Sequence, residues 1–263
     1  DDEITPLTLA GVDLLVITAP FSSTGFTENE TTAIANWYAA GGHLLLSGRG
    51  DYNPVNHQAI NALLSAIGSH LRVNDDNVYT TNADPDYYKD WYCNTDEYGT
   101  DSVADSIRGP LNRKIQFFSP NSIYSIDNSE NVHFLMFGEE YFYQKNNDQE
   151  PPDVVFDTTA DNVGGTSIPL AAVEQNESSS LALFGSTIWS DYDFGLSNRD
   201  NKYLAFNTIE WLLQIDLKSN DDYQPGVFNN TETLTETLPT TSPTKISPYP
   251  LLFSSACLAA VSY

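Results

Sequence analysis

The sequence has 263 residues, of which 36 are Asp or Glu and only 11 are Lys or Arg, so its formal net charge at pH 7 is −25. A surface this negative repels phosphates and has no basic stripe to displace counterions, which argues against a nucleic acid as partner. With 40% hydrophobic residues, including 15 Tyr and 13 Phe, the chain can bury the core of one large domain and still leave a tail.

The excess of carboxylates has two interpretations. Solvated carboxylates keep a protein soluble where salt screens charge over short distances, so the composition fits a high-salt medium. A specific cation site is the alternative, but the carboxylates are spread along the chain instead of clustering at ligand spacings. We therefore expect a salt-adapted surface.

The first elements alternate between strands and helices. Residues 12–18 form a mostly apolar run between a glycine and a proline, which predicts a strand covered on both faces. Thr27 and Glu30 form a capping box that begins a helix over 27–40, and 43–47 is a second buried strand.

A second helix is predicted after Pro54. Apolar residues recur there at helical spacing, namely Ile60, Leu63, Leu64 and Ile67, and Gly68 ends the helix. This β-α-β-α order with short connections predicts an α/β fold with a doubly wound, mostly parallel flavodoxin-like sheet.

The middle of the chain departs from this alternation. Residues 74–110 are polar and aromatic without a clear period, which predicts an inserted aromatic-rich excursion from the sheet, with 84–98 as a candidate lid. Short strand-like runs then suggest antiparallel additions at 114–118, 132–137, 154–156 and 170–174. A buried strand over 180–185 and a helix containing Ala205, Ile209, Leu212 and Leu213 close the domain near Leu217.

The composition changes after the predicted domain of residues 1–217. Residues 218–249 include a Thr/Pro-rich stretch that cannot pack a core and predicts an extended stalk. The apolar tail at 250–263 is shorter than the roughly 20 residues of a bilayer span. It is predicted to be either a truncated or processed membrane anchor or an apolar patch in a disordered tail.

Several smaller features bear on where the protein is found. Sequons at Asn29, Asn176 and Asn229 fit an exported chain, although a sequence rich in Asn, Ser and Thr also contains such triplets by chance. Cys93 and Cys257 lie far apart and are expected to be unpaired. The chain begins without an initiator Met or a signal peptide, so we expect a fragment or a processed form.

Two segments carry a family resemblance. Residues 10–51, including Trp-Tyr-Ala-Ala-Gly-Gly-His-Leu-Leu-Leu-Ser-Gly, resemble class I glutamine amidotransferase-like domains, in the branch related to gliding-motility transport auxiliary and intraflagellar-transport domains. Residues 184–187, 198–200 and 205–212 are similar to the closing strand, turn and helix of that branch. The resemblance covers most of 5–215 except the middle third. It implies a flavodoxin-like fold, and similar modules occur in surface proteins of halophilic archaea behind Thr-rich stalks.

Catalytic members of that family carry a cysteine at a nucleophile elbow, so the resemblance implies one after strand 43–47, served by a downstream His and an acid. This chain has Ser47-Gly48-Arg49-Gly50 there, and the position two residues before Ser47 is not glycine. His57, His70 and His133 do not fall where a downstream base is needed. We therefore expect no amidotransferase chemistry.

The remaining candidate is a binding cleft, because ligands of open α/β sheets lie outside the carboxyl ends of the strands. The residues at that rim are Ser22, Ser23, Ser47, Arg49, Asp51, Ser186, Trp189, Asp191 and Asp193. Arg49 could clamp a carboxylate or sulfate, or else pair with Asp51 or Asp191 to hold the loops together. Asp51, Asp191 and Asp193 are weak candidates for Ca²⁺ ligands.

Together these observations predict a non-catalytic binding or assembly module of an exported, salt-adapted surface protein. Its partner would be a small molecule or a protein, with no cofactor and with a membrane tether through the C-terminal tail. The alternative is a hydrolase of esters, amides or phosphoesters that uses Ser47, Asp51 and Asp191, with 84–98 as its lid.

Overall fold

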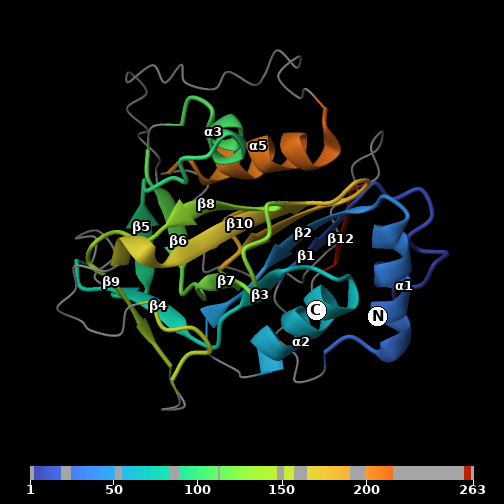
Figure 1. Ribbon diagram of the computed structural model, residues 1–263, viewed down its shortest axis with the longest axis horizontal. Helices are drawn as coiled ribbons and strands as arrows, with labels where there is room; N and C mark the ends of the chain where they lie inside the picture. The colour runs from blue at the N-terminus through green and yellow to red at the C-terminus, as the bar shows by residue number, and fades with distance from the viewer. Residues whose placement is uncertain are drawn as a thin grey trace, which may run out of the picture.

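The computed structural model describes residues 3–18, 25–50, 55–82, 89–111, 113–146, 151–156, 165–189, 199–215 and 258–261. Within them, one main sheet has the strand order β12-β1-β2-β11-β10-β8 (Figure 1). Its strands are β1 (Leu14–Ile17), β2 (His43–Ser47), β8 (Val132–Phe137), β10 (Pro169–Gln175), β11 (Ser180–Phe184) and β12 (Leu258–Val261).

The direction of the strands corrects one prediction. Pairs from β12 through β1 and β2 to β11 are parallel, whereas β10 runs antiparallel to both β11 and β8. The sheet is therefore mixed and only partly parallel, where the sequence predicted a mostly parallel one. A direct turn at residues 176–179 joins β10 to β11, and a connection this short can join only antiparallel neighbours.

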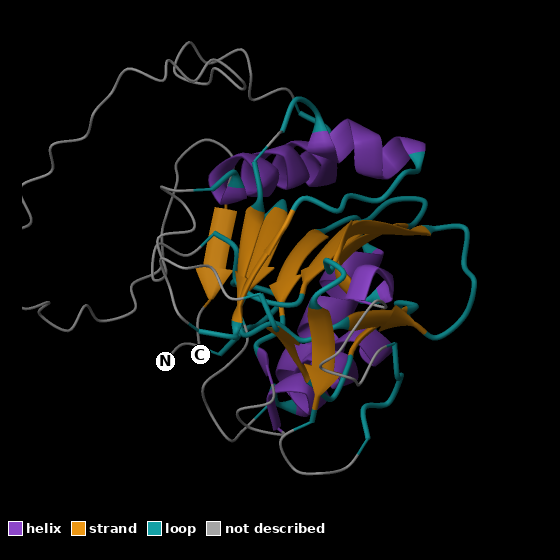
Figure 2. Cartoon of the chain, turned by 90° about the vertical axis from the view of Figure 1, so that its left-hand side faces the viewer, coloured by secondary structure: helices purple, strands orange, loops and turns teal. Residues whose placement is uncertain are grey.

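Helices cover both faces of this sheet. Figures 1 and 2 show α1 (Glu28–Ala39) and α2 (Val55–Ala66) on one face and α3 (Ser102–Arg108) and α5 (Asn201–Leu213) on the other. Alternate side chains of β1 pack into two separate hydrophobic cores. Leu15 and Ile17 lie in the core on the α1–α2 side, and Leu14 and Val16 lie in the core on the α3–α5 side. This confirms the expectation of strands buried on both faces.

The start of α1 is fixed by the predicted capping box. The Thr27 side chain accepts a hydrogen bond from Glu30 N at 3.2 Å, and Glu30 Oε2 accepts one from Thr27 N at 2.9 Å. The second oxygen of Glu30 accepts from Ile4 N at 3.2 Å, which ties the N-terminal segment to the helix. Gly41 and Gly68, which follow α1 and α2, have positive φ angles of 104° and 73°, as expected where these helices end.

The predicted excursion at 74–110 contains regular structure, namely the strands β4 and β5 and the helix α3. Three antiparallel strand pairs lie beside the main sheet: β3 (Leu71–Val73) with β7 (Ile123–Ser125), β4 (Asn77–Thr80) with β9 (Phe142–Lys145), and β5 (Tyr92–Thr95) with β6 (Ile115–Phe118). Tyr79 stacks on Tyr143 and Tyr92 tilts against Phe118, so these aromatic residues serve cross-strand packing.

The prediction that residues 84–98 form a lid is corrected in the part of that segment that the structure describes. Cys93 and Thr95 are fully buried in β5, so residues 92–95 are packed into the domain. Residues 83–88 lie outside the description. Residues 154–156 were predicted as a strand and form none.

The C-terminal region is described only at 258–261, so the predicted stalk at 218–249 lies outside the described residues. The four residues form β12 beside β1 at the edge of the main sheet. No helix in the described ranges is both long and apolar enough to cross a membrane. Cys93 is a free, buried thiol, and Cys257 is not described.

Candidate functional site

Ser47, the residue at the predicted elbow, is sealed inside the protein. It is the last residue of β2 and has 0% of its surface exposed. Its Oγ lies 2.7 Å from Thr187 Oγ1, so the two hydroxyls hydrogen-bond each other. The next residue, Gly48, donates its N–H to Phe184 O at 2.7 Å and continues the join between β2 and β11.

A segment from later in the chain fills the space above the elbow. We call residues 119–122 the plug segment. Gly50 N donates to Ser119 O at 2.8 Å, and Asn121 N donates to Gly185 O at 3.0 Å, so the plug is bonded to the ends of both strands. Ser119 has a φ of 45°, a left-handed conformation that costs a non-glycine residue about 1 kcal/mol.

The glycines at the elbow allow this close approach. A Cβ on Gly48 would lie 2.6 Å from Asn121 Oδ1, and one on Gly50 would lie 1.7 Å from Asn77 Oδ1. On Gly185 it would lie 2.1 Å from the backbone oxygen of Asn121. Any side chain at these positions would displace the plug, so the glycines serve internal packing here.

A buried carboxylate holds the plug in place. Asp76 is fully buried and accepts hydrogen bonds from Ser122 N at 2.8 Å, Ser122 Oγ at 2.7 Å and Gln144 Nε2 at 2.6 Å. Burial raises the pKa of Asp76 to about 6, and the hydrogen bonds from Ser122 and Gln144 offset only part of this effect. Asn121 adds a bond from Nδ2 to Asp76 O at 2.8 Å.

The candidates that the structure describes at this rim are Ser47, Arg49, Ser186 and Trp189. Ser186 is buried, and its Oγ has no hydrogen-bond partner among the described residues. Trp189 packs edge-on against Phe184, with ring centroids 5.9 Å apart, and is part of the core on the α5 side. Arg49 is half-buried in the elbow turn.

The other candidates cannot be placed, because Ser22, Ser23, Asp51, Asp191 and Asp193 lie outside the described residues. The predicted Ca²⁺ ligands Asp51, Asp191 and Asp193 are three of these residues. Within the described ranges, no three His, Cys, Asp or Glu side chains gather closely enough to hold a metal ion.

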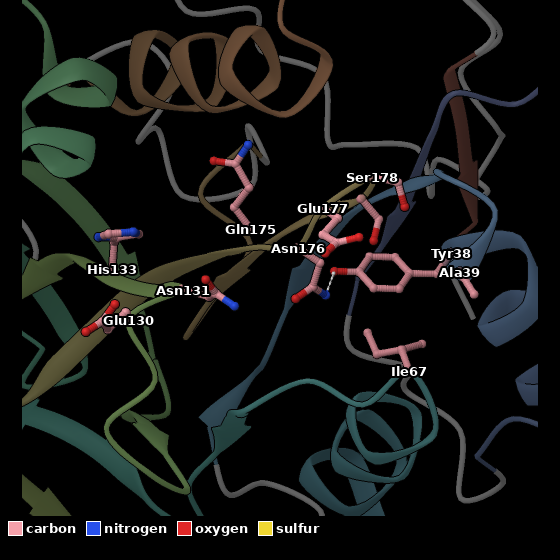
Figure 3. Close-up of a pocket in the computed structure, with 11 residues that line it drawn as sticks. Tyr38, Ala39, Ile67, Glu130, Asn131, His133, Gln175, Asn176, Glu177 and Ser178 are labelled. Atoms are coloured by element: carbon pink, nitrogen blue, oxygen red, sulfur yellow. Dashed lines mark hydrogen bonds between the residues drawn. The ribbon is translucent and has the colours of Figure 1, made fainter.

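A pocket of about 780 Å³ lies at the opposite end of the strands (Figure 3). We call it the amino-end groove, because it lies beside the turn that leads into β11. Its walls come from the ends of α1 and α2, the loop before β8, and the β10–β11 turn. The lining residues are Tyr38, Ala39, Ile67, Glu130, Asn131, His133, Gln175, Asn176, Glu177, Ser178 and Ser179.

The described lining of this groove is polar and contains no basic residue other than one histidine. Burial raises the pKa of Tyr38 to about 12, so its phenol stays neutral and keeps its proton near neutral pH. His133 is engaged with Asp101, with Nδ1 and Oδ1 3.4 Å apart. The sequence does not reveal the groove because its walls come from four separate segments, among which only the Asn176 sequon is a recognisable signal.

No protein-family model matches this chain, and no curated protein sequence does. Among solved structures, the mmIFT52 N-terminal domain matches with a TM-score of 0.58 at 18% identity, covering 82% of this chain and 84% of that one. Two cytoplasmic proteins from Salmonella typhimurium, STM3548 and STM1381, match at 12% identity with TM-scores of 0.40 and 0.41. They cover 81% and 80% of this chain and 76% of each of their own.

The likeness to mmIFT52 shows a shared fold. It confirms, at the level of fold, the predicted resemblance to an intraflagellar-transport domain.

Proposed function

We propose that this amidotransferase-like α/β domain is a non-catalytic binding or assembly module. The observation that supports it is the sealed elbow, where Ser47 is fully buried and hydrogen-bonded to Thr187. A nucleophile must reach a substrate carbonyl and be activated by a neighbouring base. The Ser47 hydroxyl instead hydrogen-bonds another hydroxyl, and none of the residue's surface is exposed.

The test is an activity screen. Purified protein is assayed against ester, amide and phosphoester substrates in molar salt, beside the variants Ser47→Ala and Ser186→Ala. We expect no turnover by any of the three proteins. Turnover by the natural sequence that is lost in Ser47→Ala but kept in Ser186→Ala, a buried hydroxyl on the same rim, would establish the hydrolase and overturn the proposal.

We further propose that the domain belongs to an exported, salt-adapted surface protein, of the kind found in halophilic archaea, with a membrane tether through its tail. The net charge of −25, the Thr/Pro-rich composition of 218–249 and the sequons support this location. Repulsion among so many carboxylates destabilises the compact state at low ionic strength, and salt screens it. We expect the melting temperature to rise steadily from roughly 0.1 M to ~1 M salt. A flat or falling curve would contradict salt adaptation.

A further inference from the structure

The sequon Asn176-Glu177-Ser178 forms the exposed turn between two core strands. Asn176 N donates to Ser179 O at 2.9 Å, which closes the turn between β10 and β11. Glu177 and Ser178 are exposed, and Asn176 is half-buried. An Asn-x-Ser triplet at a surface turn is the arrangement in which the asparagine amide can accept a glycan without disturbing a strand.

The acceptor nitrogen points into the amino-end groove. Asn176 Nδ2 donates to the hydroxyl of Tyr38 at 3.4 Å, a distance at the weak end of the hydrogen-bond range (Figure 3). Substituting one hydrogen of this amide therefore disrupts little, and a group attached to Nδ2 would lie directly over the groove.

The lining of the groove matches the chemistry of a sugar. Sugar hydroxyls both donate and accept hydrogen bonds, and the carboxamides of Asn131 and Gln175 do the same. The carboxylates of Glu130 and Glu177 add acceptors, while Ile67 offers an apolar surface for the C–H face of a ring.

The charges of the lining residues limit which kind of ligand the groove can hold. Among the described residues, no Lys or Arg lines the groove, which disfavours anions. At high salt the attraction of carboxylates for free cations is screened, so hydrogen bonding by a neutral, hydroxyl-rich group is the interaction that persists.

We propose that Asn176 is N-glycosylated and that the first sugar residues of the glycan lie in the amino-end groove. This rests on the export included in the proposed function. In the transfer step, Asn176 Nδ2 forms a bond to the anomeric carbon of a saccharide carried on a lipid phosphate. The bond from that carbon to the phosphate oxygen breaks, the lipid phosphate leaves with the electron pair, and the amide nitrogen loses one proton.

The sequon at Asn29 provides an internal comparison. Asn29 is exposed in the first turn of α1, where the next residue, Glu30, is committed to the capping box. A glycan on Asn29 would extend into solvent from a helix surface. Of these two sites, only Asn176 is expected to carry a glycan that adds contacts to the folded domain.

The first experiment asks whether Asn176 accepts a glycan. The full chain is secreted behind a leader from a glycosylating eukaryotic cell, and glycopeptides are mapped by mass spectrometry. We expect a glycan on Asn176 that is lost in Asn176→Gln and Ser178→Ala, retained in Ser178→Thr, and unaffected by Asn29→Gln. An unmodified Asn176 in the secreted protein would overturn the proposal.

The second experiment tests the groove. In an Asn29→Gln, Asn229→Gln background, the Asn176 glycan is removed enzymatically and the melting temperatures before and after are compared. We expect a fall of roughly 2–4 °C, the usual effect of losing one good interaction in a domain of this size, and a smaller fall when Tyr38 is replaced by Phe. An unchanged melting temperature would overturn the placement in the groove.

Because the leader supplies export, these outcomes are separate from the proposed function. Turnover through Ser47, or retention of the protein inside its own cell, would overturn the function or the location and leave the acceptor result standing.

Discussion

Glu174, a fully buried carboxylate on β10, accepts a hydrogen bond from His70 Nδ1 at 2.7 Å. The same carboxylate also accepts from Ser69 Oγ at 2.5 Å and from His70 N at 3.1 Å. Three donors from the segment after α2 thus satisfy one charge inside the sheet. This contact joins the α2–β3 connection to β10 at the same end of the strands as the amino-end groove.

Replacing His70 by Ala should destabilise the protein by about 1–3 kcal/mol, because one lone pair of a buried carboxylate loses its donor. Urea unfolding would measure the loss. His133→Ala is the matched control, since His133 contacts the half-exposed Asp101 and should cost less than about 1 kcal/mol. Equal losses for the two variants would contradict the structural role of the His70–Glu174 contact.

Stability should fall as the pH rises from about 4 to 6. The pKa of Asp76 is raised by burial from its ordinary 3.8 to about 6, so the folded state binds a proton more tightly than the unfolded state. The contribution of this proton to the free energy of unfolding is fully present below the ordinary pKa. It is lost as the pH rises past the pKa of the folded state, a change of about 3 kcal/mol at most. Denaturant unfolding at a series of pH values would measure it.

The variant Asp76→Asn tests the assignment of that pH dependence. An asparagine amide cannot accept all the bonds that Ser122 and Gln144 donate, so the variant should be less stable. The change in the free energy of unfolding between pH 4 and 6 that Asp76 causes should disappear, because the amide does not titrate. If the slope survives unchanged, another group causes it.

Gly185→Ala should destabilise the fold by about 1–3 kcal/mol, the usual result of overpacking. The new Cβ would lie 2.1 Å from the backbone oxygen of Asn121, which cannot rotate away as a side chain could. Gly68→Ala is the control, because its φ of 73° adds strain while no atom lies within 4 Å of the new Cβ. The control should lose about 1 kcal/mol. Thermal unfolding would measure both losses. A larger loss for Gly185→Ala than for Gly68→Ala would show that the plug segment is rigidly held, and the reverse order would contradict it.

The capping box predicts a graded series at the start of α1. Thr27→Ala should cost about 1 kcal/mol, and Glu30→Ala should cost more, because Glu30 also accepts the bond from Ile4 N. Glu28→Ala, which removes an exposed carboxylate from the same turn, should cost less than about 1 kcal/mol. A Glu30→Ala variant no weaker than Glu28→Ala would show that the box contributes nothing in solution.

Local signals explain which parts of this fold were predictable. The Thr27–Glu30 box, the glycines after α1 and α2 and the apolar runs of β1, β2 and β11 can each be recognised within a few residues, and all lie where expected. The pairs β4–β9 and β5–β6 join segments separated by tens of residues and carry ordinary polar and aromatic residues. Their pairing depends on tertiary contacts that no local period records.

The candidate site was harder to predict for the same reason. The strands that end near Ser47 and Ser186 pair in parallel, with Phe184 opposite Ser47, so these ends lie side by side. Nothing near Gly48 or Gly185 in the sequence indicates that Asn121 packs against both glycines. Asp76 is one of 36 acidic residues, and nothing in its sequence neighbourhood shows that it holds the plug from inside the protein.

The filled elbow also bears on how such a domain could change during evolution. Introducing a thiol at position 47 would not create a catalytic centre, because Ser47 has none of its surface exposed and a thiol there would remain out of reach of substrate or alkylating reagent. Clearing the space beside the elbow glycines would require withdrawing residues 119–122, which would leave Asp76 without the donors of Ser122 and the glycines without their contacts. A catalytic elbow in this chain would therefore require changes in the packing around position 47 as well as a new nucleophile.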